Sequence, residues 1–257
     1  MKGIFIVFLL VFMTNGSSFA QHYEHFTSWN RLAVNKKLSE HWEMNAEIHW
    51  RRQSDFTTPS PNPLALRLTE GYRVSTVYRV KEMAFNFAPI VFHSHPLYAN
   101  NIDLTRPTRW EIRPILFVEW TKVLSPKWTL RSRLGYEYRL FQQSDGSWGE
   151  EQGRTRLRFQ MRFNINTNNI VYVSEEPLVN IVPNVPANVF SQNQLYFAYN
   201  HTFSPHFSTE IGYMRNHRQR VTLEAVLKYL TTNSDCLILT IETIFLHKIR
   251  CIFLKKI

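Results

Sequence analysis

Arginine recurs at every second position in several segments of this 257-residue chain, whose formal net charge is +10. The clearest run holds Arg154, Arg156, Arg158 and Arg162. A guanidinium group carries five donors in a fixed fork that matches carboxylates and phosphates, so such a series could bind anions. The arginines that share the pattern are Arg67, Arg73, Arg79, Arg109, Arg113, Arg131, Arg133, Arg139, Arg154, Arg156, Arg158 and Arg162.

Glutamates occupy the same kind of position in smaller number. A buried guanidinium group must be paired with a carboxylate, share water or hold a bound anion. The excess of arginine therefore leaves two interpretations open: an ion-pair network that holds the fold together, or a basic passage that favours anions. The glutamates are Glu43, Glu47, Glu111, Glu119, Glu137 and Glu210.

The elements that position these charges are predicted to be β-strands, because the alternation has a period of two residues. In residues 42–51, Trp42, Ile48 and Trp50 share one face with Met44 and Ala46, opposite the charged residues. Residues 66–80, 109–120, 128–141 and 154–165 alternate in the same way. Weaker strands are expected at 26–34, 83–92, 170–175, 190–200 and 207–216, which makes ten in all.

The two faces of these strands predict where each one lies. A soluble sandwich has mixed polar residues on its solvent face, whereas the polar face here is dominated by arginine. The apolar face carries Trp110, Trp120, Trp128 and Tyr138 near strand ends. Transmembrane barrels combine strands of this length with an outward apolar band, aromatic girdles and a polar lumen. We therefore expect an all-β fold, an antiparallel transmembrane β-barrel of about 10–12 strands whose lumen carries the arginines and glutamates.

Connections of alternating length agree with a barrel. Short ones are expected at 35–41, 81–82, 121–127, 166–169 and 201–206, and long ones at 52–65, 93–108, 142–153 and 176–189. Outer-membrane barrels join their strands by short periplasmic turns and longer external loops. Most prolines fall in the long connections, where no ladder hydrogen bond is lost. Pro114 lies inside a strand, which predicts a bulge or a shorter strand there.

The first twenty residues predict export. Lys2 precedes an apolar run from Ile4 to Met13, and Ser18-Phe19-Ala20 resembles a cleavage site. Residues 1–20 are therefore predicted to be a signal peptide, with the barrel in residues 21–220 and the mature protein in the outer membrane.

Several short segments resemble an uncharacterised bacterial outer-membrane family, domain of unknown function 2490. The resemblance covers roughly residues 22–220 and implies a barrel with no assigned activity and no catalytic motif. The segments are Thr27-Ser28-Trp29-Asn30, Lys36-Lys37-Leu38, Glu47-Ile48-His49-Trp50-Arg51, Gln192-Asn193-Gln194-Leu195-Tyr196 and Glu210-Ile211-Gly212-Tyr213-Met214.

The end of the chain departs from that family. An outer-membrane barrel of this kind is expected to finish on an amphipathic strand that ends in an aromatic residue, whereas this chain ends at Lys255-Lys256-Ile257. Residues 221–257 also hold both cysteines, Cys236 and Cys251, and no Trp or Pro. The hypothesis is an aberrant tail, produced by a shift of the coding frame near residue 220, which has replaced the closing strand. A divergent but genuine terminus is the alternative.

Ten strands with a short first connection also place the N-terminus on the outer side. A missed strand around residues 181–189, or passage of residues 21–26 through or beneath the barrel, would resolve this.

Catalytic patterns are few. His93-Ser94-His95 could suggest a nucleophile and a base, but neighbouring residues of a strand point to opposite faces, so the pattern disfavours catalysis. The acids Asp145, Glu150, Glu151, Glu175 and Glu176 are expected in loops, as a solvated rim. No cofactor, metal or nucleic-acid partner is predicted, and the expected partners are outer-membrane lipid and small anions.

Three functions remain open from the sequence. The first is an outer-membrane barrel with a structural role or a narrow, anion-favouring transport role. The second is an outer-membrane enzyme that modifies or hydrolyses lipid, and the third a soluble periplasmic barrel that binds a ligand. The sequence leaves the oligomeric state open.

Overall fold

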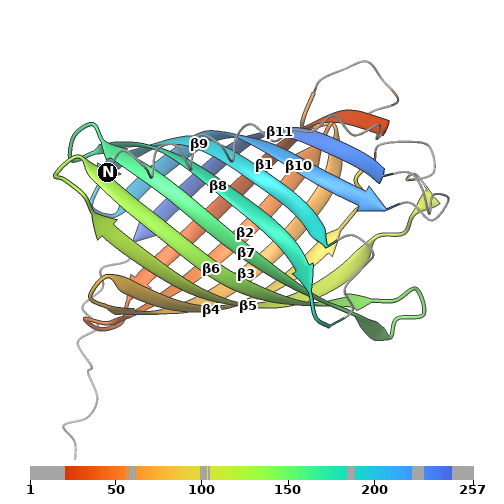
Figure 1. The fold of residues 1–257 in the computed structure, drawn as a ribbon, viewed down its shortest axis with the longest axis horizontal. Coiled ribbons are helices and arrows are strands. Elements are labelled where there is room, and N and C mark those ends of the chain that lie inside the picture. Colours follow the sequence, from red (N-terminus) through yellow and green to blue (C-terminus); the bar gives the residue numbers. More distant parts are fainter. Residues whose placement is uncertain are drawn as a thin grey trace, which may run out of the picture.

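Eleven strands form the wall of a single barrel in the part of the chain that the computed structural model describes (Figure 1). The described residues are 21–55, 57, 62–98, 103, 105–183, 189–221 and 229–244, so the predicted signal peptide lies outside them. They include no helix long and apolar enough to cross a membrane. The strands are β1 (Gln21–Lys37), β2 (Trp42–Gln53), β3 (Leu66–Val80), β4 (Met83–Ser94), β5 (Arg109–Val123), β6 (Trp128–Gln142), β7 (Trp148–Asn164), β8 (Asn169–Ile181), β9 (Phe190–Ser204), β10 (Phe207–Val221) and β11 (Tyr229–Ile244).

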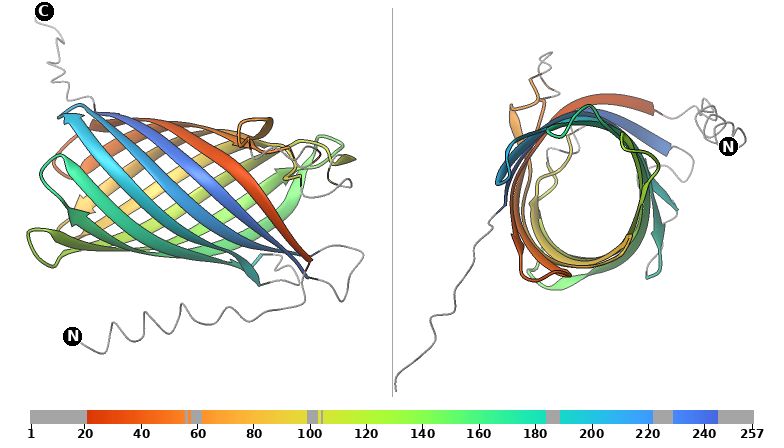
Figure 2. Two further views of the ribbon diagram at one scale, coloured as in Figure 1. Left: turned by 90° about the horizontal axis from the view of Figure 1, so that it is seen from above. Right: turned by 90° about the vertical axis from the view of Figure 1, so that its left-hand side faces the viewer.

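The strands follow one another around the ring in chain order, and each pairs antiparallel with the next. The ring closes between β1 and β11 as a parallel pair, from Gln21 opposite Leu230 to Asn35 opposite Ile244. An odd number of strands in alternating directions makes the first and last run the same way, so the seam must be parallel. The view along the barrel in Figure 2 shows the closed ring. The predicted barrel of 10–12 strands is confirmed.

The two ends of the barrel differ in the length of their connections. At one end, the short-turn end, residues 38–41, 81–82, 124–127, 165–168 and 205–206 join the strands. At the other, the long-connection end, most connections are longer, for example 54–65 and 95–108. β1 leads into a short turn and therefore begins at the long-connection end (Figure 2, left). Residues 21–26 belong to β1, so the expectation that they pass through or beneath the barrel is wrong.

The outward face is apolar over most of the wall. The side chains of Tyr72, Leu116 and Phe197 are all more than half exposed, whereas the core residues of a soluble protein are buried. Trp42 and Trp128 lie on this face at the strand ends next to the short turns. An outward apolar band with aromatic rings at its edge is the surface that a transmembrane barrel presents to lipid.

The inward face is mostly polar, but it includes an apolar patch on β4 and β5. This inner patch consists of Ala88, Ile90, Phe92, Ile115 and Phe117, all at most 5% exposed. β4 carries apolar residues on both faces, so its segment has no contrast of period two and the sequence did not reveal the patch. The rings of Phe92 and Phe117 have space because glycines face them. A Cβ atom at Gly71 or Gly135 would lie about 2.3–2.5 Å from a carbon of the facing ring.

Three local expectations differ from the structure. Pro114 causes neither a bulge nor a shorter strand: β5 keeps its register with β4 through a Pro89 and Pro114 pair. β8 continues to Ile181, so Glu176 belongs to the wall rather than to a loop. The connection between β6 and β7 is also shorter than expected, because β7 begins at Trp148.

The C-terminal segment corrects a fourth expectation. The barrel was predicted to end at residue 220 and to lack its closing strand, but β11 completes the ring with residues 229–244. β8 pairs directly with β9, so no further strand enters the wall between them. Residues 184–188, within the segment where a missed strand was expected, lie outside the described residues. Residues 222–228 and 245–257 lie outside the described residues, and the hypothesis of a shifted coding frame stays a prediction.

Candidate functional site: the arginine-lined lumen

Most of the predicted charged residues do line the lumen. Alternation places the inward positions of β5, β6 and β7 at Glu111, Glu137 and Arg154, all less than 9% exposed. Arg79 and Arg109 lie at the two ends, where their side chains are 46% and 44% exposed. The lumen residues that line a cavity or join its ion pairs are Glu43, Glu47, Arg73, Arg79, Arg109, Glu111, Arg113, Glu119, Arg131, Arg133, Glu137, Arg139, Arg154, Arg156, Arg158, Arg162 and Glu210.

Arg67 is the exception. The pairing of β2 with β3 shifts between Arg51 and Arg52, which sets Arg67 opposite Arg52. A shift of one residue moves side chains to the other face of a strand. Arg67 is exposed and is absent from the linings of the three cavities described below.

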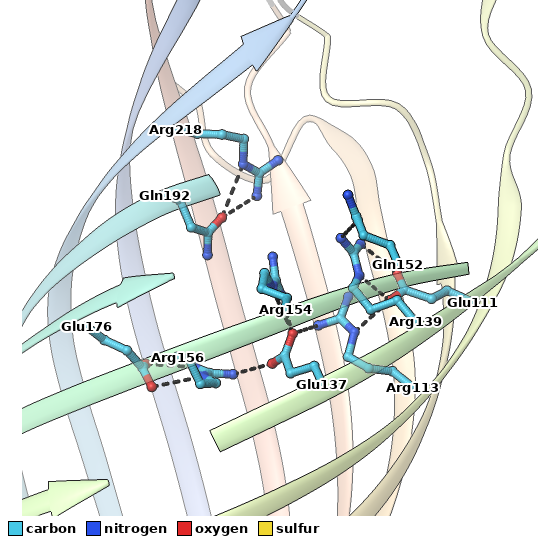
Figure 3. Close-up of polar contacts among 10 residues, drawn as sticks. All are labelled: Glu111, Arg113, Glu137, Arg139, Gln152, Arg154, Arg156, Glu176, Gln192 and Arg218. Atoms are coloured by element: carbon cyan, nitrogen blue, oxygen red, sulfur yellow. Dashed lines mark hydrogen bonds and ion pairs between the residues drawn. The ribbon is translucent and has the colours of Figure 1, made fainter. Parts of the chain in front are cut away.

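Glu137 lies at the centre of the lumen network and is fully buried (Figure 3). Its Oε2 accepts a hydrogen bond from Nε of Arg154 at 2.8 Å, and its Oε1 accepts one from Nη1 of Arg156 at 2.7 Å. Arg156 also donates through Nε to Oε1 of Glu176 at 2.7 Å. Because these residues come from β6, β7 and β8, the chain of ion pairs crosses three neighbouring strands. We call Glu137, Arg156 and Glu176 the central layer.

A second cluster adjoins the central layer on β5 and β6. Oε1 of Glu111 accepts hydrogen bonds from Nε of Arg113 at 2.6 Å and Nε of Arg139 at 2.7 Å. Nη1 of Arg113 also lies 3.7 Å from Oε2 of Glu137, which links the two clusters (Figure 3). Arg139 donates to the amide of Gln152 at 2.8 Å. These arginines are less than one-fifth exposed, so their pairs lie in surroundings of low dielectric constant, where charges interact strongly.

A third cluster lies nearer the short-turn end. Glu119 accepts hydrogen bonds from Arg131 at 2.7 Å and from Arg133 at 2.8 Å. The nearest atoms of Arg158 and Glu119 are 3.5 Å apart.

Glu47 and Glu210 occupy the remaining inward positions near this end. Glu47 lies 3.5 Å from a guanidinium nitrogen of Arg73 and 3.9 Å from one of Arg31. Glu210 differs from the other glutamates, since it accepts a hydrogen bond from the hydroxyl of Tyr196 at 2.9 Å.

Aromatic rings of the inner wall support the guanidinium groups. Arg133 and Arg156 lie over the ring of Phe117 at 4.9 and 5.6 Å, and Arg113 lies over Phe92 at 4.7 Å. A cation over a ring face is attracted by the quadrupole of the ring and needs no counter-charge there. The inner apolar patch therefore adds cation–π contacts to guanidinium groups that are also paired with carboxylates.

The lumen holds three cavities. The mouth cavity, about 670 Å³, opens at the long-connection end and is lined by Ser94, His95 and Arg109 among others. The arginine chamber, about 300 Å³, lies beneath it and shares Arg51, Arg113 and Arg139 with it. The lower cavity, about 460 Å³, lies at the short-turn end.

The lower cavity is distinct from the other two. It shares no lining residue with the arginine chamber or the mouth cavity. Glu137 and Glu176 of the central layer, 0% and 6% exposed, line none of the three cavities.

Several lumen residues escaped the sequence analysis. Arg31, Arg218 and Glu242 line cavities but belong to segments in which a strand was predicted weakly or not at all. Arg51 ends the clearly predicted strand 42–51 but was not included among the lumen arginines. Glu176 was assigned to a loop because Glu175, Glu176 and Pro177 together are typical of one. Its alternation with Tyr172, Ser174, Leu178 and Asn180 was the signal that could have placed it on the inner face.

The histidine and serine pattern shows no hydrogen-bonded nucleophile and base among the described residues. His93 and Ser94 are neighbours on β4, and His93 contacts Trp110 with ring centroids 4.7 Å apart. Within the described residues, no hydrogen bond joins the Ser94 hydroxyl to His93 or His95. Burial lowers the pKa of His95, which follows the strand. Lipid hydrolysis by this segment stays an untested prediction. The described residues contain no group of three or more His, Cys, Asp or Glu side chains that could hold a metal ion.

The comparisons decide the family. The family model described as "Protein of unknown function (DUF2490)" matches residues 26–226, about three-quarters of the chain. The chain belongs to the DUF2490 family. The resemblance noted in the sequence is thereby confirmed, and the match ends just beyond the point where the tail begins to depart from it.

One solved structure is similar to this DUF2490 barrel. It is described as "NanC porin structure in rhombohedral crystal form", with 14% sequence identity and a TM-score of 0.46. The match covers 79% of this chain and 87% of that one. No functionally curated protein matches the chain.

Proposed function

We propose that this barrel lies in the outer membrane and provides a narrow path for small anions. The observation that carries the proposal is the charge of the inward face. Among the described residues, Arg31, Arg51 and Arg218 add to the predicted arginines, and Glu176 and Glu242 add to the glutamates. Because Arg67 does not line the lumen, the excess of arginine over glutamate on the described inward face is as large as the sequence suggested. Lumens with rings of arginine favour anions and repel cations.

The outward face supports the membrane location. Leu116, Leu134 and Phe197 are exposed where a soluble barrel would need polar residues. A ring of such residues around a closed sheet is stable in hydrocarbon, because every backbone group bonds within the barrel. The same face disfavours a soluble periplasmic barrel. The predicted signal peptide would supply the export signal.

Passage through the central layer requires an exchange of partners. Arg156 is held by two carboxylates, those of Glu137 and Glu176. An entering anion can accept the same hydrogen bonds, and the guanidinium group then returns to its carboxylates after the anion has left. Small, compact anions suit this exchange best.

Recordings in planar lipid bilayers test the proposal. The purified full chain, inserted between two chambers of unequal potassium chloride concentration, should give small unitary currents and a reversal potential set by chloride. A cation-selective current would refute the proposal. Folded barrels that carry no current would leave the structural role, in which the ion pairs only hold the wall together.

A further inference from the structure

We propose that the arginine chamber is a binding site for a small oxyanion that accepts hydrogen bonds on several sides. We define the chamber by its six arginines, Arg51, Arg113, Arg139, Arg154, Arg156 and Arg218, which come from β2, β5, β6, β7 and β10. Its lining includes no aspartate or glutamate among the described residues. The inference deepens the proposed function by naming the kind of anion, and it rests on that function only for the route by which the anion arrives.

The carboxylates that hold four of these arginines do not line the chamber. Glu111 bonds Arg113 and Arg139, and Glu137 bonds Arg154 and Arg156. Glu111 lines the adjoining mouth cavity instead. Guanidinium groups from several strands therefore face a space with no carboxylate in its described lining, where an oxyanion with several oxygen atoms can accept hydrogen bonds on more than one side.

Two arginines of the facing wall contact uncharged groups that orient them. The guanidinium carbon of Arg51 lies 3.9 Å from the ring centroid of Trp29. Arg218 donates from Nε and Nη2 to Oε1 of Gln192 at 3.2 and 3.1 Å (Figure 3). Stacking and amide bonds fix the direction of a guanidinium group, which is the preparation that an anion site requires.

The size of the chamber and its uncharged lining residues limit further which ligands fit. A cavity of about 300 Å³ is at the lower limit of ordinary ligand sites, so the ligand must be small. Gln192 and Gln194 are both less than 9% exposed, and their amides can accept as well as donate hydrogen bonds. Arginine forks bind phosphate and carboxylate oxygens equally in geometry. A phosphate monoester and a dicarboxylate both have this chemistry.

Titration calorimetry on the detergent-solubilised full chain, in a buffer of low ionic strength, tests the site with sulfate as the probe. We expect one sulfate per barrel, and weaker binding by about tenfold in Arg218→Gln, because a charged hydrogen-bonding partner is lost. Arg162→Gln is the matched control, since it removes an arginine from the lower cavity and should change the affinity by less than about twofold. Heat-modifiable migration on gels verifies that both variants are folded.

Glycerol phosphate and succinate, titrated in the same way, distinguish a phosphate-ester site from a dicarboxylate site. Equal weakening in both variants would show only a diffuse positive field and would overturn the site. Specific, Arg218-dependent binding in a barrel that carries no current would refute the transport function and retain the site. An anion-selective current that sulfate does not block, together with no calorimetric binding, would refute the site and retain the transport function.

Discussion

The arginine chamber and the lower cavity contain similar numbers of guanidinium groups but differ in where the carboxylates lie. In the lower cavity Glu43, Glu47 and Glu119 line the space itself, together with Glu210 and Glu242. No aspartate or glutamate is among the described residues that line the chamber. Composition alone therefore does not set the field that an ion meets: the strand register that buries or exposes each glutamate does. The chamber has room for a bound anion, whereas the arginines of the lower cavity already face the carboxylates that line it.

Glu137 is the most critical residue of the central layer, because it is fully buried and pairs with two arginines of the chamber. Glu137→Gln leaves Arg154 and Arg156 buried with one carboxylate fewer, and an uncompensated buried charge is costly. We expect a loss of about 3–5 kcal/mol in the free energy of unfolding. Urea unfolding in lipid vesicles, followed by tryptophan fluorescence, measures it.

Glu43→Gln is the control for that loss. Its partner Arg79 is nearly half exposed, and exposed ion pairs contribute about 0–1 kcal/mol. If both variants unfold at the same urea concentration, the central layer does not hold the wall together.

Gln53 holds residues 95–98, which cover the mouth cavity on one side. Gln53 is fully buried; its Nε2 donates to the carbonyl oxygens of Arg67 and Pro96, and its Oε1 accepts from the amide of Tyr98. Gln53→Ala should lower the free energy of unfolding by about 1–3 kcal/mol.

The same variant should release the segment that follows β4. We expect faster protease cleavage near residues 95–98 and a larger unitary current, because the long-connection end is less covered. Unchanged cleavage and current would show that Gln53 only fills space. The lower cavity has no contact with Gln53, so Asn45→Ala at that end should leave both quantities as they are.

The sequence predicted the wall well because the contrast between an outer apolar face and an inner charged face has a period of two residues, as in β2 and β7. It failed where that contrast is absent or interrupted. β4 is apolar on both faces, so the inner patch around Phe92 was not foreseen. Arg67 was assigned to the lumen because an irregularity of one residue leaves no mark in the alternation.

The contacts of the site could not be predicted at all. That Arg156 joins Glu137 and Glu176 depends on the registers of β6 with β7 and of β7 with β8, which single strands do not encode. The parallel seam follows from the parity of the strands, which became apparent only when residues 229–244 were found in the wall.

Selectivity should change when the carboxylates of the lower cavity are removed. Glu119 faces Arg131, Arg133 and Arg158, so Glu119→Gln exposes three positive charges to an ion that passes through. In a partly aqueous lumen, one unit charge a few ångströms from a passing ion changes the energy of that ion by about 1 kcal/mol. We expect the ratio of chloride to potassium permeability to rise about fivefold in reversal-potential measurements. Arg131→Gln should lower the ratio, and equal ratios in the two variants would contradict the electrostatic account.

The smallest effect is expected outside the lumen, at the turn between β3 and β4. Glu82 accepts hydrogen bonds from Lys122 and from Nε1 of Trp120, both at 3.1 Å. The bond from Lys122, followed by that from Trp120, lowers the pKa of the Glu82 carboxyl. A carboxylate whose pKa is depressed by folding stabilises the protein above its unfolded pKa, and loses that contribution as the pH falls through the folded value.

Glu82→Gln should therefore lower the Tm slightly at pH 7, and the difference from the unmodified protein should vanish as the medium is acidified below about pH 4. Thermal scans in detergent between pH 7 and pH 3 measure this difference. Because the carboxylate lies in solvent, added salt should reduce it as well. A difference that persisted at low pH and high salt would mean that Glu82 acts by holding the Trp120 ring at the edge of the apolar band, and not by its charge. In that case the structure at the edge of the apolar band, like that of the lumen, would depend on how a carboxylate positions its partners.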